Sequence, residues 1–389
     1  MSIVIFGDNF SFPEGNAATN RVYSYAKGFI ENGVITCVIC FRNDYMDDGN
    51  GIIEEIQYFN PINRKVRDSS FLKRNWFKLV KYFNTVKIIR RFNKNTKIEA
   101  IITYTKISTT HLFSWLLARL TGAKLIIENS EHPLRYYQSG FIKKITGNLK
   151  LRIELATFDG ILLITQNLID FYRSKLNTES NLLLVPSTVD PSRFSKTRTN
   201  NLPYKYIGYF GSINFERDNV DCLINSFALI HEKFDDLHLV LGGMYSEIEK
   251  KLVIDLINSL KIESRVHLLN YMSRDEIIQY MINAQIIVLV RKNDPNTEAS
   301  FPSKLIEYIA TGNPVISADV SEISKYLKDG ENGFLTKPGD VKELSEKLEY
   351  VLRNYQLATE VAQKGKDLTK MVFNYKYQAN RILEFIKSV

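Results

Sequence analysis

Residues 298–318 carry the side chains in this sequence that are best suited to bind an anion. Ser303 supplies a hydroxyl and Lys304 an ammonium directly after Pro302, which suits the first position of a helix. The free N–H groups and the positive dipole end of a helix start favour a phosphate. Glu307 follows one turn later on the same side, where a carboxylate can accept hydrogen bonds from ribose hydroxyls. The combination predicts a nucleotide site.

The elements that must position these residues are a short helix and a strand. Gly312 suits the left-handed residue that ends a helix after Thr311, and Pro314 opens an apolar strand. Apolar strands are predicted at residues 2–6, 34–41, 99–103, 124–128, 159–164, 182–186, 206–210, 237–242, 265–268, 286–290 and 314–318. Helical segments separate most of them, which predicts an α/β fold with parallel sheets in two successive Rossmann-like domains.

Three runs resemble the C-terminal half of a family 4 retaining glycosyltransferase of the GT-B fold. They are Phe-Pro-Ser-Lys-Leu-Ile-Glu-Tyr at 301–308, Ala-Thr-Gly-Asn-Pro-Val-Ile at 310–316 and Gly-Glu-Asn-Gly-Phe-Leu at 330–335. The similarity covers most of the second half of the chain and, more loosely, residues 1–40. It implies two Rossmann-like domains with parallel sheets facing across a cleft, and a C-terminal helix that crosses back to the N-terminal domain.

The resemblance also implies what each part of the chain does. Residues 1–195 would form an acceptor-binding domain, 203–372 a donor domain, and 373–389 the returning helix, with the seam in the polar stretch 192–203. The donor would be a UDP- or GDP-linked hexose, transferred with retention and without a required cofactor or metal. The acceptor would be a lipid-linked or polymeric glycan, as in bacterial surface-polysaccharide synthesis.

The first turn of the donor domain departs from the family pattern. In the family this turn carries an arginine after a glycine and a lysine before the helix, both on the diphosphate. Here Ser212 follows Gly211, while Arg217 falls near the lysine position. Arg217 and Lys304 are therefore predicted to neutralise the leaving diphosphate. The remaining contacts expected near the nucleotide are Gly243, Tyr271, Met272, Phe301, Pro302, Ser303 and Leu305.

The family also has two glutamates separated by seven residues. Glu307 matches the second, but Ala299 stands at the first position and Glu298 lies one residue early. Either Glu298 still faces the sugar, or backbone N–H groups at 300–303 replace the missing carboxylate.

Two loops of the first domain are candidates for the acceptor side. Gly15 and Asn16 lie in a loop after the first strand, where small residues permit close approach of a ligand. Glu131 and His132 follow a buried strand, and either could bind sugar hydroxyls or take the acceptor proton. The alternative is an ordinary polar loop that Pro133 turns.

The positive charge of the chain is concentrated in residues 64–97. Twelve lysines and arginines stand there against one acid, Asp68, so the segment carries +11 and the rest of the +8 chain −3. Aromatic and aliphatic residues are interleaved at helical spacing, which favours a helix on an anionic membrane surface. The alternative is a helix that packs into its own domain with solvated lysines. No nucleic-acid-binding signature accompanies the charge.

Composition sets the remaining expectations. The 389 residues, 44% hydrophobic, suffice for two cores. The N-terminus reads as a strand rather than a signal peptide, so we expect a cytoplasmic protein, peripheral on the inner membrane face. Cys37 and Cys40 lie in an apolar strand without a second ligand pair, so no zinc or redox role is predicted.

A nucleotide-sugar 2-epimerase and a non-catalytic nucleotide-sugar-binding subunit remain alternatives, whereas the glycine spacing disfavours an NAD-dependent oxidoreductase.

Overall fold

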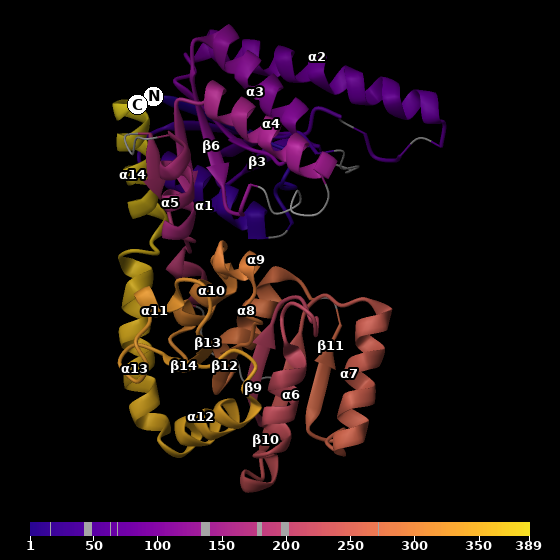
Figure 1. The fold of residues 1–389 in the computed structure, drawn as a ribbon, viewed down its shortest axis with the longest axis vertical. Helices are drawn as coiled ribbons and strands as arrows, with labels where there is room; N and C mark the ends of the chain where they lie inside the picture. The colour runs from indigo at the N-terminus through magenta and orange to yellow at the C-terminus, as the bar shows by residue number, and fades with distance from the viewer. Residues whose placement is uncertain are drawn as a thin grey trace. The chain divides into compact units, whose positions relative to one another are not determined.

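The computed structural model describes residues 1–15, 17–42, 49–62, 64–67, 69–133, 141–176, 181–195, 202–270 and 272–389. Asn16 and Tyr271, two of the predicted ligand contacts, lie outside the described residues. The chain divides into two compact units (Figure 1). Unit 1 contains Met1–Thr188 and Tyr375–Val389, and unit 2 contains Val189–Asn374.

Unit 1 is built on a sheet of eight described strands in the order β3-β4-β2-β1-β5-β6-β7-β8. The strands are β1 (Ser2–Gly7), β2 (Ile35–Cys40), β3 (Asn50–Ile53), β4 (Ile56–Phe59), β5 (Ala100–Tyr104), β6 (Lys124–Asn129), β7 (Gly160–Leu163) and β8 (Leu182–Leu184). All neighbours are parallel except β3 and β4, which form an antiparallel hairpin. Because β1 lies between β2 and β5, its carboxyl end is at the centre of the sheet.

Helices cover both faces of this sheet. The helices are α1 (Ala17–Glu31), α2 (Phe71–Asn95), α3 (Ser108–Thr121), α4 (Phe141–Thr157), α5 (Gln166–Leu176) and α14 (Tyr375–Ser388). Side chains of a strand alternate between faces, so Ile3 joins one core with α1 and α14 while Val4 joins the other with α2 and α3. Ala379 and Ile382 of α14 are fully buried in the first core, which confirms the predicted return of the C-terminal helix.

Unit 2 repeats the layered arrangement around the sheet β11-β10-β9-β12-β13-β14, whose described strands are all parallel. The strands are β9 (Lys205–Phe210), β10 (Leu237–Gly242), β11 (Val266–Leu269), β12 (Ile286–Leu289), β13 (Val315–Ala318) and β14 (Phe334–Thr336). The α-helices are α6 (Val220–Ala228), α7 (Glu247–Leu260), α8 (Arg274–Asn283), α9 (Pro295–Glu298), α10 (Ser303–Thr311), α11 (Ile323–Tyr326), α12 (Val341–Arg353) and α13 (Tyr355–Asp367). Short 3₁₀ turns lie at Pro191–Phe194, His231–Lys233 and Leu368–Lys370. The two parallel α/β units confirm the predicted fold class.

Cys37 and Cys40 do not form a dithiol pair. Three residues apart on β2, they point to opposite faces of the sheet, and each is buried in a different core. Burial alone raises the pKa of the Cys37 thiol. Both cysteines therefore act as small apolar core residues.

The basic segment forms the long helix α2. Its inner side buries Thr85 and Ile89, together with one of its lysines. Lys81 donates to the carbonyl oxygen of Phe41 at 3.1 Å and lies 4.0 Å from that ring, so it is a structural residue. No helix of the described residues is long and apolar enough to cross a membrane.

Candidate functional site

Two glycine turns touch at the carboxyl ends of β9 and β10. The amide of Gly211 donates to the carbonyl oxygen of Gly242 at 2.8 Å. A Cβ added at Gly243 would lie 1.8 Å from the oxygen of Gly211, and Gly243 has φ +145°. Only glycine permits this approach of two backbones. In open α/β sheets the carboxyl ends of the strands are where ligands bind.

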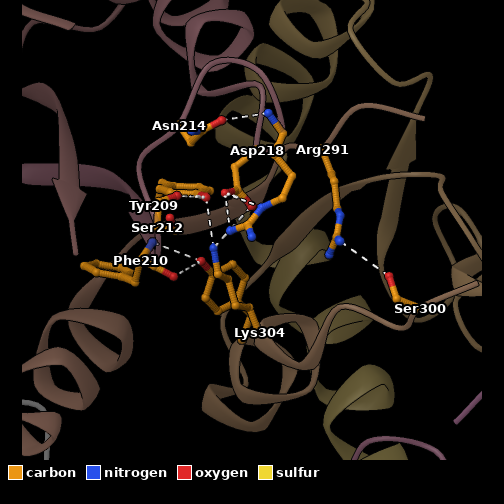
Figure 2. Close-up of polar contacts among 10 residues, drawn as sticks. Tyr209, Phe210, Ser212, Asn214, Asp218, Arg291, Ser300 and Lys304 are labelled. Atoms are coloured by element: carbon orange, nitrogen blue, oxygen red, sulfur yellow. Dashed lines mark hydrogen bonds and ion pairs between the residues drawn. The ribbon is translucent and has the colours of Figure 1, made fainter. Parts of the chain in front are cut away.

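Lys304 of α10 lies directly over the first of these turns. A Cβ at Gly211 would be 2.1 Å from Lys304 Nζ. The ammonium donates to the Tyr209 hydroxyl at 3.0 Å, and this hydroxyl donates to the carbonyl oxygen of Ser212 at 2.7 Å (Figure 2). Desolvation by burial, with help from Arg217 and Arg291, lowers the pKa of Lys304 to about 8, although the carboxylate of Asp218 raises it.

Asp218 holds a second cation beside the lysine. Its buried carboxylate accepts from Nε and Nη2 of Arg217 at 3.2 and 2.8 Å, and its other oxygen lies 3.6 Å from Lys304 Nζ. The Asn214 side chain accepts from the Arg217 amide at 2.7 Å, which fixes the turn before α6. The Arg217 side chain is 52% exposed, so a bound anion can reach it.

Arg291 is a third cation, and sequence reasoning missed it. It stands two residues after the end of β12, and its Nη2 donates to the Ser300 hydroxyl at 3.4 Å (Figure 2). Its Nε is buried and has no hydrogen-bond partner among the described residues. Burial lowers its pKa, while Asp218 and Asp294 act in the opposite direction. The only sequence signal was its place after a buried parallel strand.

Arg217, Arg291 and Lys304 together are called the cationic cluster. Asp218 and Asp294 are carboxylates that interact with these cations, and the Glu307 carboxylate also interacts with Lys304. Buried charges that repel one another raise the free energy of the empty site, and a bound anion relieves that repulsion. The cluster is therefore suited to a phosphate group.

Helix α10 begins beside the cationic cluster. Pro302 is its N-cap, Ser303 its first residue, and Gly312 its C-cap with φ +77°. The first amides of a helix have no intrahelical acceptor, so the N–H groups at Ser303 and Lys304 add donors to the cluster. Tyr308 anchors the helix from behind, since its hydroxyl donates to the carbonyl of Phe210 at 2.6 Å and accepts from the Phe210 amide at 2.9 Å.

Comparison with known proteins identifies this part of the chain. The sequence profile of the family "Glycosyl transferases group 1" matches residues 192–368. Residues 192–368 are therefore similar to group 1 glycosyltransferase domains, and we refer to them below as the group 1 domain. An uncharacterized glycosyltransferase of Haemophilus influenzae is 23% identical over 316 residues, which cover 79% of this chain and 80% of that protein.

Two further proteins are similar. The capsular polysaccharide biosynthesis glycosyltransferase CapM of Staphylococcus aureus is 26% identical over 183 residues, 47% of this chain and 45% of that protein. The crystal structure of Anabaena HepE in complex with UDP and glucose has a TM-score of 0.72 at 15% identity, over 99% of each chain. This structural similarity shows that the chain has the GT-B fold.

Glu307 of the group 1 domain is partly buried one turn beyond Lys304. Burial raises the pKa of its carboxyl, and Arg274, Arg193 and Lys304 oppose that shift. Arg274 Nη2 lies 3.9 Å from its Oε1. The carboxylate is thus held among cations.

The other predicted ligand contacts of the group 1 domain lie in different surroundings. Met272 lies against the glycine turn, since a Cβ at Gly242 would be 2.7 Å from its Cε. Glu298 is exposed at the end of α9, while Ala299 is buried. Phe301 and Leu305 are buried too, with Phe301 packed against Tyr326 and Phe373. Their side chains support the start of α10 from the interior.

The predicted acceptor-side residues lie in unit 1. Glu131 follows β6 and pairs with Lys106 Nζ at 2.9 Å. The His132 ring packs on Phe171 with centroids 4.6 Å apart, and burial lowers its pKa. Gly15 is needed for close packing, because a Cβ there would lie 2.3 Å from the Thr19 hydroxyl. Among the described residues no group of three or more His, Cys, Asp or Glu side chains is arranged to hold a metal ion.

Proposed function

We propose that this protein transfers a hexose-type sugar from a nucleoside-diphosphate sugar, UDP- or GDP-linked, to a glycan acceptor. The observation that carries the proposal is the cationic cluster on the paired glycine turns of the group 1 domain. The cluster binds the diphosphate, and the α10 amides add donors. Glu307 accepts hydrogen bonds from the ribose, and Met272 lies against the base.

The chemistry follows from the charge that develops as the sugar leaves. The glycosidic bond to the diphosphate breaks and leaves a positively charged, oxocarbenium-like sugar and an additional negative charge on the phosphate. Pre-placed cations stabilise this charge without reorganising at the moment of reaction. We propose retention as in family 4, with attack from the face that the diphosphate leaves. A phosphate oxygen or His132 takes the acceptor proton, and no protein nucleophile is involved.

The acceptor is proposed to be a lipid-linked or polysaccharide glycan of the kind assembled at bacterial surfaces. The relative CapM is a capsular polysaccharide biosynthesis protein, which supports this acceptor class. The exposed apolar and basic side chains of α2 support a place on an anionic membrane surface, peripheral to the cytoplasmic face. Glu131 and His132 would contact acceptor hydroxyls.

One assay series separates this function from the alternatives. A thermal-shift panel of UDP, GDP, ADP and CMP identifies the base, since a ligand that binds the native state raises the melting temperature. The protein is then incubated with the matching radiolabelled nucleotide sugars. A transferase slowly hydrolyses the donor without an acceptor, an epimerase converts the sugar, and a binding subunit returns the donor unchanged. Conversion or full recovery of the donor would contradict the proposal.

A further inference from the structure

The outer surface of unit 1 exposes apolar side chains on three neighbouring helices. Helix α2 lies beside α3, and α3 beside α4 (Figure 1). On α2 the exposed apolar residues include Leu72, Trp76, Leu79 and Phe83, spaced as one stripe of a helix. Exposed leucines and an isoleucine continue the pattern on the other two helices, at Leu112, Leu116, Leu120, Ile145 and Leu149. The apolar surface is therefore formed by a layer of helices and not by α2 alone.

A groove of about 210 Å³ opens in this layer between α2 and α3. We call it the α2–α3 groove. Its walls include Val86 and Ile89 from one helix and Leu117 and Leu120 from the other. Two polar wall residues are already engaged: Asn93 accepts from the Ile98 amide at 2.8 Å, and Thr121 donates to the Leu117 carbonyl at 2.9 Å. Ile89 and Leu117 are buried and form the floor, so Val86 and Leu120 are the apolar side chains that a ligand can contact.

Two cations stand at the rim of the α2–α3 groove. Arg90 and Lys94 line it, one turn apart on α2, and both are exposed. Neither has a carboxylate within ion-pair distance among the residues that the structure describes. Side chains at this spacing can hold one phosphate between them. The groove therefore pairs an apolar channel with a site for a single anion.

The size of the groove restricts what it can hold. Pockets for whole drug-sized ligands measure about 300–1,000 Å³. A groove of about 210 Å³ is too small for a nucleotide sugar, but it fits part of a hydrocarbon chain. An apolar chain joined to a phosphate is the amphiphile that an anionic bilayer supplies.

We propose that the α2–α3 groove binds an anionic phospholipid, with one acyl chain between Val86 and Leu120 and the headgroup phosphate between Arg90 and Lys94. The proposal rests on the membrane-surface part of the proposed function and is independent of the donor chemistry. The surrounding apolar stripes lie in the same bilayer surface. The groove then makes the contact specific for a lipid phosphate rather than for negative charge in general.

Isothermal titration of the full chain with dihexanoyl phosphatidylglycerol below its micelle concentration tests the groove without a bilayer. Dihexanoyl phosphatidylcholine and glycerol phosphate are titrated in parallel. We expect saturable binding of one phosphatidylglycerol, and at least tenfold weaker binding of the other two. Arg90→Glu with Lys94→Glu removes the phosphate contact, and Leu120→Trp fills the groove at an exposed position, so each weakens binding at least tenfold.

Two matched variants control the result. Lys73→Glu with Lys78→Glu makes the same charge change on the same helix, ~25 Å away at 1.5 Å per residue and beyond the Debye length. Leu112→Trp makes the same change on α3 outside the groove. Both must bind like the native chain. No saturable binding, or equal losses in the control variants, overturns the groove proposal. Donor hydrolysis that persists in all variants shows that the transferase proposal is unaffected.

Discussion

Arg291 brings to the cationic cluster a positive charge that position 212 does not supply. The family resemblance led us to expect an arginine directly after Gly211, where this chain has Ser212. Arg291 reaches the same group of charges from the turn after β12, so the charge is provided by a different strand. Its buried Nε has no hydrogen-bond partner among the residues that the structure describes, so it is a donor for which a diphosphate oxygen would be an acceptor.

Replacing Arg291 with methionine should therefore weaken the binding of the nucleoside diphosphate. A hydrogen bond to a charged group is worth about 1.5–3 kcal/mol, which is roughly 10- to 100-fold in Kd. Titration calorimetry with the diphosphate selected by the thermal-shift panel measures the loss. Lys251→Met, on the exposed side of α7, is the matched control. An unchanged Kd for Arg291→Met would remove this residue from the donor site.

The lowered pKa of Lys304 predicts that use of the donor depends on pH. Its pKa is lowered to about 8, so the ammonium that we propose binds the diphosphate is present below pH 8 and is lost as the pH rises above it. We expect kcat/KM for the donor, which reports the free enzyme, to fall tenfold for each pH unit above about 8. The guanidinium of a Lys304→Arg variant stays charged, so the decline should disappear even if the rate is lower. The same decline in that variant would assign it to another group.

At the scale of elements, the sequence predicted helix α10 of the site but did not predict the β3–β4 hairpin. Pro302 and Gly312 bracket α10 as predicted, with the helix one residue shorter at its start. The β3–β4 hairpin was missed because its turn residues are Glu54 and Glu55, both with positive φ, whereas such turns usually use Asn and Gly. The ion pair between Lys27 and Glu54 at 3.0 Å is a tertiary contact, which the local sequence pattern does not predict.

The same contrast holds for the candidate site. Sequence position placed Arg217, Lys304 and Glu307 at strand ends and a helix start, where chemistry is expected. It could not show that Asp218 joins the two cations, because this depends on how the turn before α6 packs against α10. Arg291 was missed for the same reason, since its relation to the cluster arises only when β12 lies beside β9. The local sequence pattern predicts the helices and strands, whereas the order of the strands in the sheet determines which side chains come into contact.

Substitutions on helix α2 test the membrane proposal. Charge reversal at Lys73, Lys87 and Arg91 keeps its buried side intact, because all three are exposed. Each basic residue near an anionic surface contributes about 1 kcal/mol, so the triple variant should bind phosphatidylglycerol vesicles at least ~100-fold more weakly at low salt. Vesicle flotation measures the binding. The matched control reverses Lys251, Lys342 and Lys364, which are exposed in unit 2. Equal flotation of both variants would contradict the membrane proposal.

At the scale of the whole molecule, each unit has its own core, and the chain contributes its two ends to one of them. The β1 and α1 residues pack against α14, while the residues of unit 2 form a separate cluster. Gly28 of α1 shows how close that packing is, because a Cβ there would lie 2.5 Å from Ala379 Cβ. The last helix is thus part of the fold of unit 1, although it follows unit 2 in the sequence.

A single truncation in the last helix should therefore destabilise the first half of the chain. Ile382 is fully buried among residues of α1 and the sheet, so Ile382→Ala leaves a cavity and costs about 2–5 kcal/mol of the free energy of unfolding. The loss falls on unit 1, and unit 2 keeps its own core. Hydrogen exchange followed by mass spectrometry should show faster exchange in β1, α1 and β5, with β9 and β10 unchanged. Lys387→Ala, exposed on the same helix, is the control. Uniform acceleration in both units would mean that they unfold as one cooperative body, and faster exchange confined to unit 2 would contradict the assignment of α14 to unit 1.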